Sequence, residues 1–389
     1  MKQGLETKRL GEFCDIKHGY AFDGADFSTD YFGNNPIVLT PGNFSENATL
    51  IFNDKNTKRC TGDYSNNYVF NLGDLVVVMT DLSSKMKILG KPAIIENDNI
   101  LHNQRIGRFV FFNDSINKKY LYYLLQSETY LKSIKDSATG TMVRHTAPQR
   151  ILNFKIPVPP LTYQLRIVSI IDKAFATITT AKANAEQNLK NAKELFESYL
   201  QGVFEKKGEG WEVKTLNLIS DNLDSKRVPI TKSVRNEGSI PYYGASGIVD
   251  YVADYLFDED LLCVSEDGAN LLARTYPIAF SISGKTWVNN HAHILRFKSM
   301  VSQKFVELYL NSIKLDDFVS GMAQPKLNQA MLNKIPIPFP PLPEQESIVQ
   351  RLDALSAETK KLEAIYQQKV VDLEELKKSV LQKAFNGEL

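Results

Sequence analysis

A chain of 389 residues predicts two or three domains, and its 43% hydrophobic and 23% charged residues exclude a disordered, collagen-like or disulfide-stapled chain. The 46 Lys and Arg residues nearly balance the 45 Asp and Glu residues, which argues against a protein that wraps duplex nucleic acid by bulk charge alone. No apolar run approaches the ~20 residues of a membrane span, and the N-terminus lacks the apolar core of a signal peptide. We therefore expect a cytoplasmic protein with no membrane partner.

The first predicted domain covers residues 1–160 and mixes strands with helices. Residues 74–78 form a short apolar run after an acidic turn, which is typical of a buried strand, and a polar loop follows at 80–91. Residues 120–134 are rich in large apolar side chains at helical spacing and predict a helix. A proline-rich stretch that closes at Pro160 ends the domain.

The rest of the chain follows the same plan a second time. The predicted order is a long helix with its linker at 161–206, a second domain at 207–341 and a second long helix at 342–389. Inside the second domain, a matching strand, loop and helix are expected at 260–264, 265–274 and 305–313.

An internal repeat joins the two halves. Residues 156–168 read IPVPPLTYQLRIV and residues 337–349 read IPFPPLPEQESIV, which places Gln164 over Gln345 at an offset of 345 − 164 = 181 residues. A period of this length indicates a duplicated domain rather than a solenoid.

A weaker match joins the starts of the two halves. LETKRLGEF at 5–13 resembles WEVKTLNLI at 211–219, with Lys8 over Lys214. The chain therefore contains two copies of one unit, in which the globular parts have diverged more than the helices that follow them.

Both predicted long helices carry apolar residues in alternating steps of four and three, the heptad pattern of a coiled coil. At about 40 residues, each would be roughly 60 Å long and could not bury its apolar stripe alone. We expect an α+β fold in which two similar globular domains are joined by these helices, paired as an antiparallel coiled coil about a pseudo-twofold axis. Two unrelated helices, each on its own domain, are the alternative. The predicted seam residues are Ile167, Ile171, Ile178, Leu195, Tyr199, Ile348, Leu352, Leu355, Leu362, Leu373 and Leu376.

No motif identifies a catalytic residue, a metal site or a cofactor site. The GKT sequence at 284–286 lacks the first glycine of a phosphate-binding loop, since Ala279 stands there. His291 and His293 would place two imidazoles on one face of a strand, with no third ligand nearby in sequence. The three cysteines form no CxxC pair and are expected to be free thiols. A hydrolase that uses scattered carboxylates stays open.

Basic residues gather in the predicted loops among Asn, Gln, Ser, Thr and Tyr. Because Lys and Arg contact phosphates while Arg, Lys, Asn and Gln read base edges, this mixture favours two DNA-reading heads on a rigid spacer. The contacts are expected from 80–91, 140–146, 265–274 and 321–328. A solvated loop is the alternative for any single cluster. The predicted DNA-binding residues are Lys85, Lys87, Arg144, Lys226, Arg227, Arg274, Lys285, Asn290, His291 and Lys326.

The repeat also carries a resemblance to a known family. The duplicated IPxPPLxxQxxIV stretch, followed by a heptad helix that closes on Phe385-x-Gly387, resembles the specificity subunit of type I restriction–modification systems. Residues 223–230, 267–274 and 287–295 look like a target-recognition domain of that family. The resemblance covers essentially the whole chain.

The resemblance implies that each globular half is a target-recognition domain that reads one half of a bipartite double-stranded DNA site through the major groove. The coil would set the spacer between the half-sites and dock two modification subunits. The chain itself would be non-catalytic and hold no cofactor, with S-adenosylmethionine on the adenine-methylating modification subunits. Up to two restriction subunits would add ATP-driven translocation and cleavage, in the service of phage defence.

One residue departs from the family pattern, because Tyr163 stands where the second copy has Glu344. A glutamate supports a helix N-terminus through the helix dipole, so the first helix lacks this support and Tyr163 is expected to pack instead. Two other functions stay open at this stage. They are a specificity subunit for a fused methylase–nuclease and a coiled-coil scaffold with two ligand-binding heads that binds no DNA.

Overall fold

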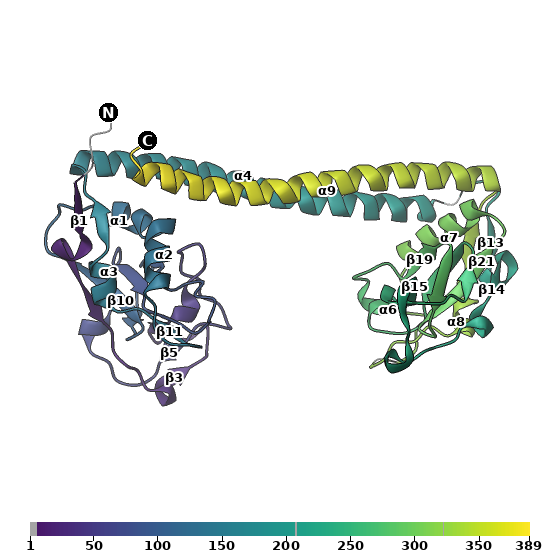
Figure 1. Ribbon diagram of the computed structural model, residues 1–389, viewed down its shortest axis with the longest axis horizontal. Helices are drawn as coiled ribbons and strands as arrows, with labels where there is room; N and C mark the ends of the chain where they lie inside the picture. The colour runs from purple at the N-terminus through teal and green to yellow at the C-terminus, as the bar shows by residue number, and fades with distance from the viewer. Residues whose placement is uncertain (1–5, 207, 322) are drawn as a thin grey trace. The chain divides into compact units, whose positions relative to one another are not determined.

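The computed structural model describes residues 6–206, 208–321 and 323–389 (Figure 1). The chain divides into unit 1, which holds the residues up to Asn184 together with Lys369–Leu389, and unit 2, which holds Ala185–Gln368. Both boundaries fall inside the two long helices, so each unit contains one globular domain and part of each helix. The predicted domain limits at residues 1 and 207 lie outside the described residues and stay predictions.

Domain 1, the globular part of unit 1, is built on two four-stranded sheets. The first is antiparallel, in the order β2 (Cys14–His18), β10 (Ile106–Phe111), β6 (Leu75–Val78) and β8 (Pro92–Ile94). The second has the order β3 (Phe27–Ser28), β5 (Arg59–Cys60), β4 (Ile37–Leu39) and β9 (Ile100–His102), with β4 and β9 parallel. All four residues of β6 are buried, which confirms the strand predicted at 74–78.

The helix predicted at 120–134 is interrupted. It forms α1 (Lys118–Leu124) and α2 (Glu128–Asp136), because the Ser127 side chain accepts a hydrogen bond from the Tyr130 amide and starts a new helix. Tyr120 and Tyr130 are buried in the domain core. The remaining helical segments of the described part of domain 1 are α3 (Pro148–Leu152) and the 3-10 turns Leu10–Glu12, Gly24–Asp26, Pro41–Asn43 and Asn66–Tyr68.

Domain 2, the globular part of unit 2, also contains two four-stranded sheets. The first is antiparallel, in the order β14 (Ser220–Asn222), β21 (Ala292–Phe297), β18 (Leu261–Ser265) and β19 (Ala279–Ile282). The second has the order β16 (Gly247–Val252), β15 (Glu237–Gly244), β20 (Lys285–Val288) and β17 (Phe257–Asp258). All five residues of β18 are buried, which confirms the strand predicted at 260–264.

The helices of domain 2 cover its first sheet, and α7 (Met300–Ser312) contains almost all of the helix predicted at 305–313. Ser299 starts α7 by accepting a hydrogen bond from the Ser302 amide. The other helical segments of the described residues are α5 (Leu216–Ile219), α6 (Asn270–Ala273), α8 (Gln329–Leu332) and the 3-10 turns Asp224–Lys226 and Lys232–Val234.

Each domain is closed by a two-stranded antiparallel ladder between its start and its exit. In domain 1, β1 (Thr7–Arg9) pairs with β12 (Lys155–Pro157), which places Lys8 opposite Ile156. In domain 2, β13 (Glu212–Lys214) pairs with β22 (Ile337–Phe339), which places Lys214 opposite Ile337. The weak sequence match between the two starts therefore marks one structural feature that occurs in both copies.

The duplicated glutamine fixes the start of each long helix to its domain. The Nε2 atom of Gln164 donates to the carbonyls of Pro159 and Ser115 at 2.9 and 3.0 Å, and that of Gln345 donates to Pro340 at 2.7 Å. Ser302, at the start of α7, donates to Oε1 of Gln345 at 2.8 Å. These bonds fix the first turn of each long helix to its domain and set the direction in which the helix leaves that domain.

The two residues that differ at the junctions take different partners. Oε1 of Glu344 accepts a hydrogen bond of 2.8 Å from the Trp211 indole. The Tyr163 hydroxyl instead donates to the carbonyl of Leu389 at 3.2 Å, and Tyr163 packs against the core of unit 1. The first helix thus loses an acidic group at its N-terminus and gains a contact with the end of the chain.

The two long helices are α4 (Leu161–Glu205) and α9 (Leu342–Phe385), and parts of them lie side by side in each unit (Figure 1). In unit 1 they run antiparallel, because Tyr163 contacts Leu389 while Lys182 forms an ion pair with Glu374. In unit 2, both helices contribute to one core. The predicted α+β fold with two similar domains and an antiparallel helix pair is confirmed. Among the described residues, none of the helices combines the length and hydropathy that a bilayer span requires.

The buried stripe of α4 departs from the predicted heptad frame near its C-terminal end. Ile167, Ile171 and Ile178 are buried, but Leu195 and Tyr199 are 51% and 41% exposed. The stripe moves by one position to residues that include Leu200 and Phe204, which are buried.

The same departure occurs in α9, where Leu362 and Leu376 are exposed and Leu381 and Ala384 are buried. Of the other predicted α9 seam residues, Ile348 and Leu352 are buried and Leu355 and Leu373 half-buried. The physical cause is the same in both helices. An α-helix drifts by about 20° per heptad, and the last turns rotate to pack on a globular domain rather than only on the other helix.

Candidate functional site

A buried histidine connects the loops of domain 2. His293, on β21, is 1% exposed; its Nδ1 atom lies 2.6 Å from Oδ2 of Asp224 and its Nε2 atom 2.7 Å from the carbonyl of Leu327. Asp224 belongs to the segment 223–230, and Leu327 to the segment 321–328. Since both neighbours are hydrogen-bond acceptors, the imidazole donates to both only when it carries two protons.

Arg227 joins a third segment to this cluster. Its Nη1 atom donates to Oε2 of Glu266 at 2.6 Å and to the carbonyl of Ala292 at 2.8 Å, and its Nη2 atom lies 3.5 Å from Oδ2 of Asp224. The Lys326 ammonium lies 3.2 Å from Oε1 of Glu266. We call Asp224, Arg227, Glu266, His293 and Lys326 the charged hub. It ties 223–230, 265–274 and 321–328 together.

The two carboxylates of the charged hub are held in their ionised form. Burial by itself would raise the pKa of Asp224, but the hydrogen bond and charge of His293 lower this pKa below its ordinary value. Burial likewise opposes ionisation of Glu266, while Arg227, His293 and Lys326 lower its pKa. The ligand atoms of Asp224, Glu266 and His293 lie within 4.8 Å of one another, a spacing that suits a cation. Because Arg227 and Lys326 already balance both carboxylates, the geometry favours an ion-pair network over a metal centre.

The predicted contact residues around the charged hub differ in exposure. Lys226, Asn290 and Lys326 are exposed, and the half-exposed His291 side chain lies 2.8 Å from Oδ2 of Asp267. Lys285 lies elsewhere in domain 2, with its ammonium 4.7 Å from the centre of the Tyr255 ring. The loops of domain 2 therefore present cations and amides at the surface, and the charged hub lies beneath these loops.

Two of the predicted contact residues point into the protein. The Arg227 side chain is 13% exposed and bound within the charged hub. Arg274 has a left-handed backbone with φ of 52°, and its guanidinium group donates to the carbonyls of Leu310 and Ile313 at the end of α7. In this structure both arginines hold loops in place, and their contact with DNA stays a prediction.

The prediction that His291 and His293 share one face of a strand is wrong. Strand β21 begins at Ala292, so His291 lies in the preceding turn, where its amide donates to the Asn289 side chain at 2.8 Å. His291 is exposed whereas His293 is buried.

In domain 1, a short ladder and a side-chain hydrogen bond, rather than an ion pair, link the loops 80–91 and 140–146. Strands β7 (Thr80–Asp81) and β11 (Arg144–His145) form a short antiparallel ladder, and the Thr80 hydroxyl lies 3.1 Å from Nδ1 of His145. The Asp81 carboxylate accepts from the amides of Ser83 at 2.8 Å and Ile88 at 2.9 Å, which shapes the loop 80–91. The two predicted contact segments of domain 1 therefore meet.

The predicted contact residues of domain 1 lie on these two loops. Lys85 and Lys87 are exposed, and the ammonium of Lys87 lies 2.5 Å from a Glu46 carboxylate oxygen. Arg144 is half-buried, and its Nε atom has no hydrogen-bond partner among the residues that the structure describes. The Nε atom itself is buried, so a ligand would reach it only if the Arg144 side chain moved.

The loop links of the two domains occupy matching positions. His145 and Lys326 are separated by the offset of the repeat, and Thr80 and Glu266 by the offset of strands β6 and β18. The turn before each link needs a glycine, since a Cβ atom on Gly140 would lie 2.0 Å from the Val143 carbonyl oxygen. Gly321 has the same left-handed backbone, with φ of 82°. Of the predicted segment 321–328, residue 322 lies outside the described residues.

Sequence reasoning missed Asp224, Glu266 and His293 as a connected group. These residues lie on separate elements, and only the pairing of β18 with β21 brings Glu266 and His293 together. The sequence offered one indication of this group: Asp224 lies in the stretch LDSKRVPI, close to Lys226 and Arg227, which were predicted to contact DNA.

A comparison with protein families identifies one family, whose model matches the chain twice. The model of the type I restriction modification DNA specificity domain matches residues 2–191 and again residues 208–370. Most of the chain is covered, and each copy of the repeat carries one match.

Similar proteins come from the same kind of system. A putative type I restriction enzyme specificity subunit of Haemophilus influenzae is 40% identical over 157 residues, which is 40% of this chain and 40% of that protein. The MjaVIII specificity subunit of Methanocaldococcus jannaschii is 32% identical over 145 residues, 36% of this chain and 34% of that protein. The chain thus spans two fifths or less of the length of these two relatives. The solved HsdS subunit of Thermoanaerobacter tengcongensis shares the fold, with a TM-score of 0.64 at 18% identity, and the comparison covers 100% of this chain and 98% of that one.

Proposed function

Because this chain belongs to the type I restriction modification DNA specificity family, we propose that it is the specificity subunit of such a complex, in which each domain reads one half of a bipartite DNA site. One observation carries the proposal. In each domain, a loop that begins with a glycine contacts the turn that follows a central strand, β6 in domain 1 and β18 in domain 2, and the two contacts occupy matching positions. These anchored loops present cations and amides, the groups that contact phosphates and base edges in the major groove. The family also supports this function over a hydrolase or a scaffold without DNA.

We assign DNA contact to the exposed members of the predicted set and to Arg144. In domain 1 these are Lys85, Lys87 and Arg144, and in domain 2 they are Lys226, Lys285, Asn290, His291 and Lys326. Arg227 and Arg274 would have to give up bonds inside the protein in order to reach DNA, so we assign them the positioning of loops. With a net charge of only +1, the chain alone would bind DNA weakly and would need its partners for full affinity.

We propose that two modification subunits dock on exposed apolar residues of the long helices. Leu161 and Leu342 are 42% and 49% exposed, and Leu195 and Leu376 are 51% and 48% exposed. Each pair is separated by the offset of the repeat, and each unit carries one member of each pair. A surface that occurs twice in one chain suits two copies of one partner.

The same proposal covers the rest of the complex. The chain holds no catalytic group of its own in this scheme, and S-adenosylmethionine for adenine methylation belongs to the modification subunits. Restriction subunits, up to two, would bring ATP-driven cleavage, and the complex would act in the cytoplasm.

We further propose that the helix pair sets the spacer between the half-sites. Seven residues inserted at matching places in both helices would lengthen each by about 10 Å. At 3.4 Å per base pair, the preferred spacer should then grow by about three base pairs. An unchanged spacer at sequenced methylation sites would show that the helices do not measure it.

The function is tested by mapping N6-methyladenine in cells with and without the chain. We expect one bipartite motif to disappear when the chain is absent. Lys326→Gln should relax one position of one half-site, with a cost of roughly 1–3 kcal/mol if the lysine contacts a base. Arg144→Gln should relax the other half-site, and Lys314→Gln, an exposed lysine of domain 2 outside the predicted contact set, should leave the motif intact. A methylation pattern that does not depend on the chain would refute the proposal.

A further inference from the structure

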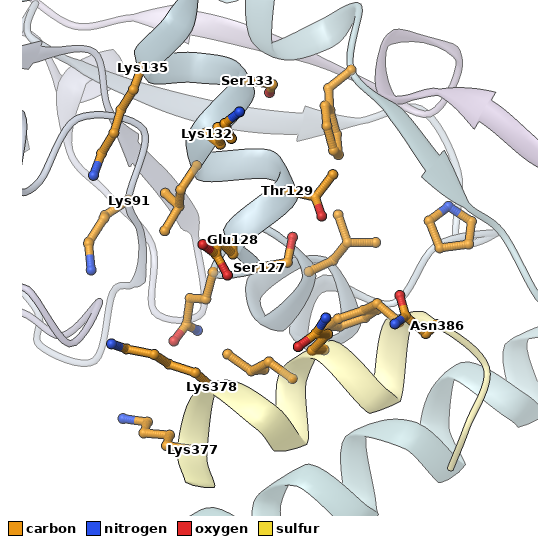
Figure 2. Close-up of a pocket in the computed structure, with 18 of the residues that line it drawn as sticks. Lys91, Ser127, Glu128, Thr129, Lys132, Ser133, Lys135, Lys377, Lys378 and Asn386 are labelled. Atoms are coloured by element: carbon orange, nitrogen blue, oxygen red, sulfur yellow. The ribbon is translucent and has the colours of Figure 1, made fainter. Parts of the chain in front are cut away.

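A pocket of about 1070 Å³ lies within unit 1, between α2 and the last turns of α9. Figure 2 shows the C-terminal turns of α9 below the pocket and α2 above it. Apolar side chains, among them Leu124, Leu131, Leu381 and Phe385, line part of the wall, and charged groups line the rest. Nothing in the proposed DNA reading uses this pocket.

Four lysines gather along one side of the pocket (Figure 2). Lys91 follows the loop 80–91 into β8, Lys135 lies on α2, and Lys377 and Lys378 lie on α9. Three segments distant in sequence therefore bring positive charge to one place. We call these four residues the lysine wall.

The carboxylates that line the pocket offset the lysine wall only in part: the charge of Glu46 acts on Lys91 and Lys135, and the Lys91 ammonium donates to the Glu46 carbonyl. Glu46 lies 2.5 Å from Lys87, outside the wall, and Glu374 forms its ion pair with Lys182. Among the described residues, no carboxylate lies within ion-pair distance of Lys135, Lys377 or Lys378. The wall thus carries an excess of positive charge.

Keeping the lysine wall charged costs free energy in the free protein. Burial lowers the pKa of Lys91 below its ordinary value, and the charge of Lys135, with smaller effects of Lys377 and Lys378, lowers it further against the opposing charge of Glu46. Burial also lowers the pKa of Lys377. An anion placed between these groups would offset both the desolvation and the mutual repulsion.

We propose that the lysine wall is a binding site for phosphate groups. Lysine ammonium groups bind phosphates as point charges, and several along one wall suit consecutive phosphates. The phosphates could come from the DNA backbone or from a free diphosphate or triphosphate. The DNA source rests on the proposed function and is favoured by continuity, since Lys91 ends the loop that carries Lys85 and Lys87.

Unit 2 lacks the α9 part of this site. The positions that match Lys377 and Lys378 in the repeat hold Phe196 and Glu197. An apolar ring and a carboxylate replace two ammonium groups, so phosphate binding of this kind belongs to unit 1 alone.

The first test measures binding of inorganic pyrophosphate to the full chain by calorimetry. The double variant Lys135→Gln, Lys378→Gln should bind pyrophosphate at least about tenfold more weakly than the unmodified chain, a loss of 1.4 kcal/mol or more. The control is Lys173→Gln, Lys383→Gln, which removes the same charge from exposed lysines of unit 1 that do not line the pocket. Equal binding by the double variant and the unmodified chain, or no binding by either, would overturn the proposal, whether or not the chain directs methylation.

The second test distinguishes the two phosphate sources. For a DNA source, the double variant should lower the slope of log affinity against log salt by about 2, equally for cognate and non-cognate duplexes. An unchanged slope with lost pyrophosphate binding would assign the site to a free phosphate compound. If the double variant still binds pyrophosphate but no longer co-purifies with a modification subunit, the pocket is a protein-docking surface and the proposal fails.

Discussion

Two buried histidines show how the two domains differ. His102 in domain 1 and His293 in domain 2 are each 1% exposed. The His102 imidazole lies with Nε2 2.8 Å from the Ile106 carbonyl, and burial lowers its pKa to about 4, so it is neutral. His293 bridges the Asp224 carboxylate and the Leu327 carbonyl.

The same contrast occurs where the recognition loops are fastened. Domain 1 uses the hydroxyl–imidazole contact of Thr80 and His145, and domain 2 uses the ion pair of Glu266 and Lys326 at the matching positions. The two domains thus position their loops with the same backbone arrangement, but the polar groups beneath the loops differ. A duplicated scaffold can therefore keep its geometry while the chemistry under each reading surface changes.

Removing one member of the charged hub should give the largest effect. Arg227→Met removes the buried cation that lies 2.6 Å from Glu266 and 3.5 Å from Asp224 and should destabilise unit 2 by about 3–5 kcal/mol. Denaturant unfolding followed by tryptophan fluorescence measures this directly, since Trp211 and Trp287, the two tryptophans of the chain, both lie in unit 2.

Arg296→Met is the matched control for Arg227→Met. Arg296 lies 3.5 to 3.6 Å from Glu259 and Asp221, but its side chain is 40% exposed. A loss below about 1 kcal/mol is expected for such a surface pair. Equal losses from the two arginine variants would show that the charged hub is no more than a surface network.

The corrected helix stripe gives the next largest effect. Leu200→Ala removes a buried side chain from the core of unit 2 and should cost about 2–4 kcal/mol. Leu195→Ala, five residues earlier on the exposed face of α4, should change stability by less than about 0.5 kcal/mol and instead weaken binding of a modification subunit. Tryptophan fluorescence and co-purification measure the two effects. If Leu195→Ala destabilised the protein more than Leu200→Ala, the heptad frame predicted from the sequence, with Leu195 in the seam, would be correct.

These departures show which features local sequence predicts. The apolar runs at 74–78 and 260–264 and the duplicated junctions were predicted correctly, because each depends on residues that are neighbours in the chain. The position of the seam near Leu195 was not, because it depends on how the helix end packs on a domain that is remote in sequence. At the end of α4, packing on the globular domain therefore overrides the heptad periodicity.

The candidate site was predicted at the level of segments but not of contacts. The sequence indicates that 223–230, 265–274 and 321–328 carry polar groups, and the structure brings these three segments together. It does not indicate that Arg227 faces inward, because its partner Glu266 is known only once the strands are paired. Charged residues in loops therefore predict a surface, whereas their individual roles require the fold.

Acid titration should separate the domains over different pH ranges. Because the pKa of His102 falls from 6.5 to about 4 on folding, the unfolded chain binds more protons between these values. Domain 1 should therefore lose about 2–3 kcal/mol of stability as the pH falls from 6.5 to 4. In domain 2, the lowered pKa values of Asp224 and Glu266 stabilise the fold at higher pH, and this contribution is lost only as the pH falls below the ordinary values of 3.8 and 4.5.

Hydrogen exchange at pH 7 and pH 4.8 measures this difference in each domain. Amides in β10 should lose protection at the lower pH, and those in β21 should not. His102→Asn removes the titrating group and should abolish the loss in domain 1. A parallel loss in both domains would mean that His102 does not control the acid response.

The smallest effect is expected at the neutral loop link of domain 1. Thr80→Val removes the hydroxyl that faces His145, but His145 is exposed and can bond to water, so the cost should be about 0.5–1.5 kcal/mol. The loop should stay attached because the Thr146 amide still donates to the Met79 carbonyl at 2.9 Å, and exchange of that amide measures the link. Thr177→Val, on the exposed face of α4, is the control and should leave this amide unchanged. Because the Thr80 hydroxyl carries no charge, the cost should be the same at about 50 and about 500 mM salt. If the cost of Thr80→Val depended strongly on salt, charge would stabilise the domain 1 link as well, and the two domains would not differ in this respect.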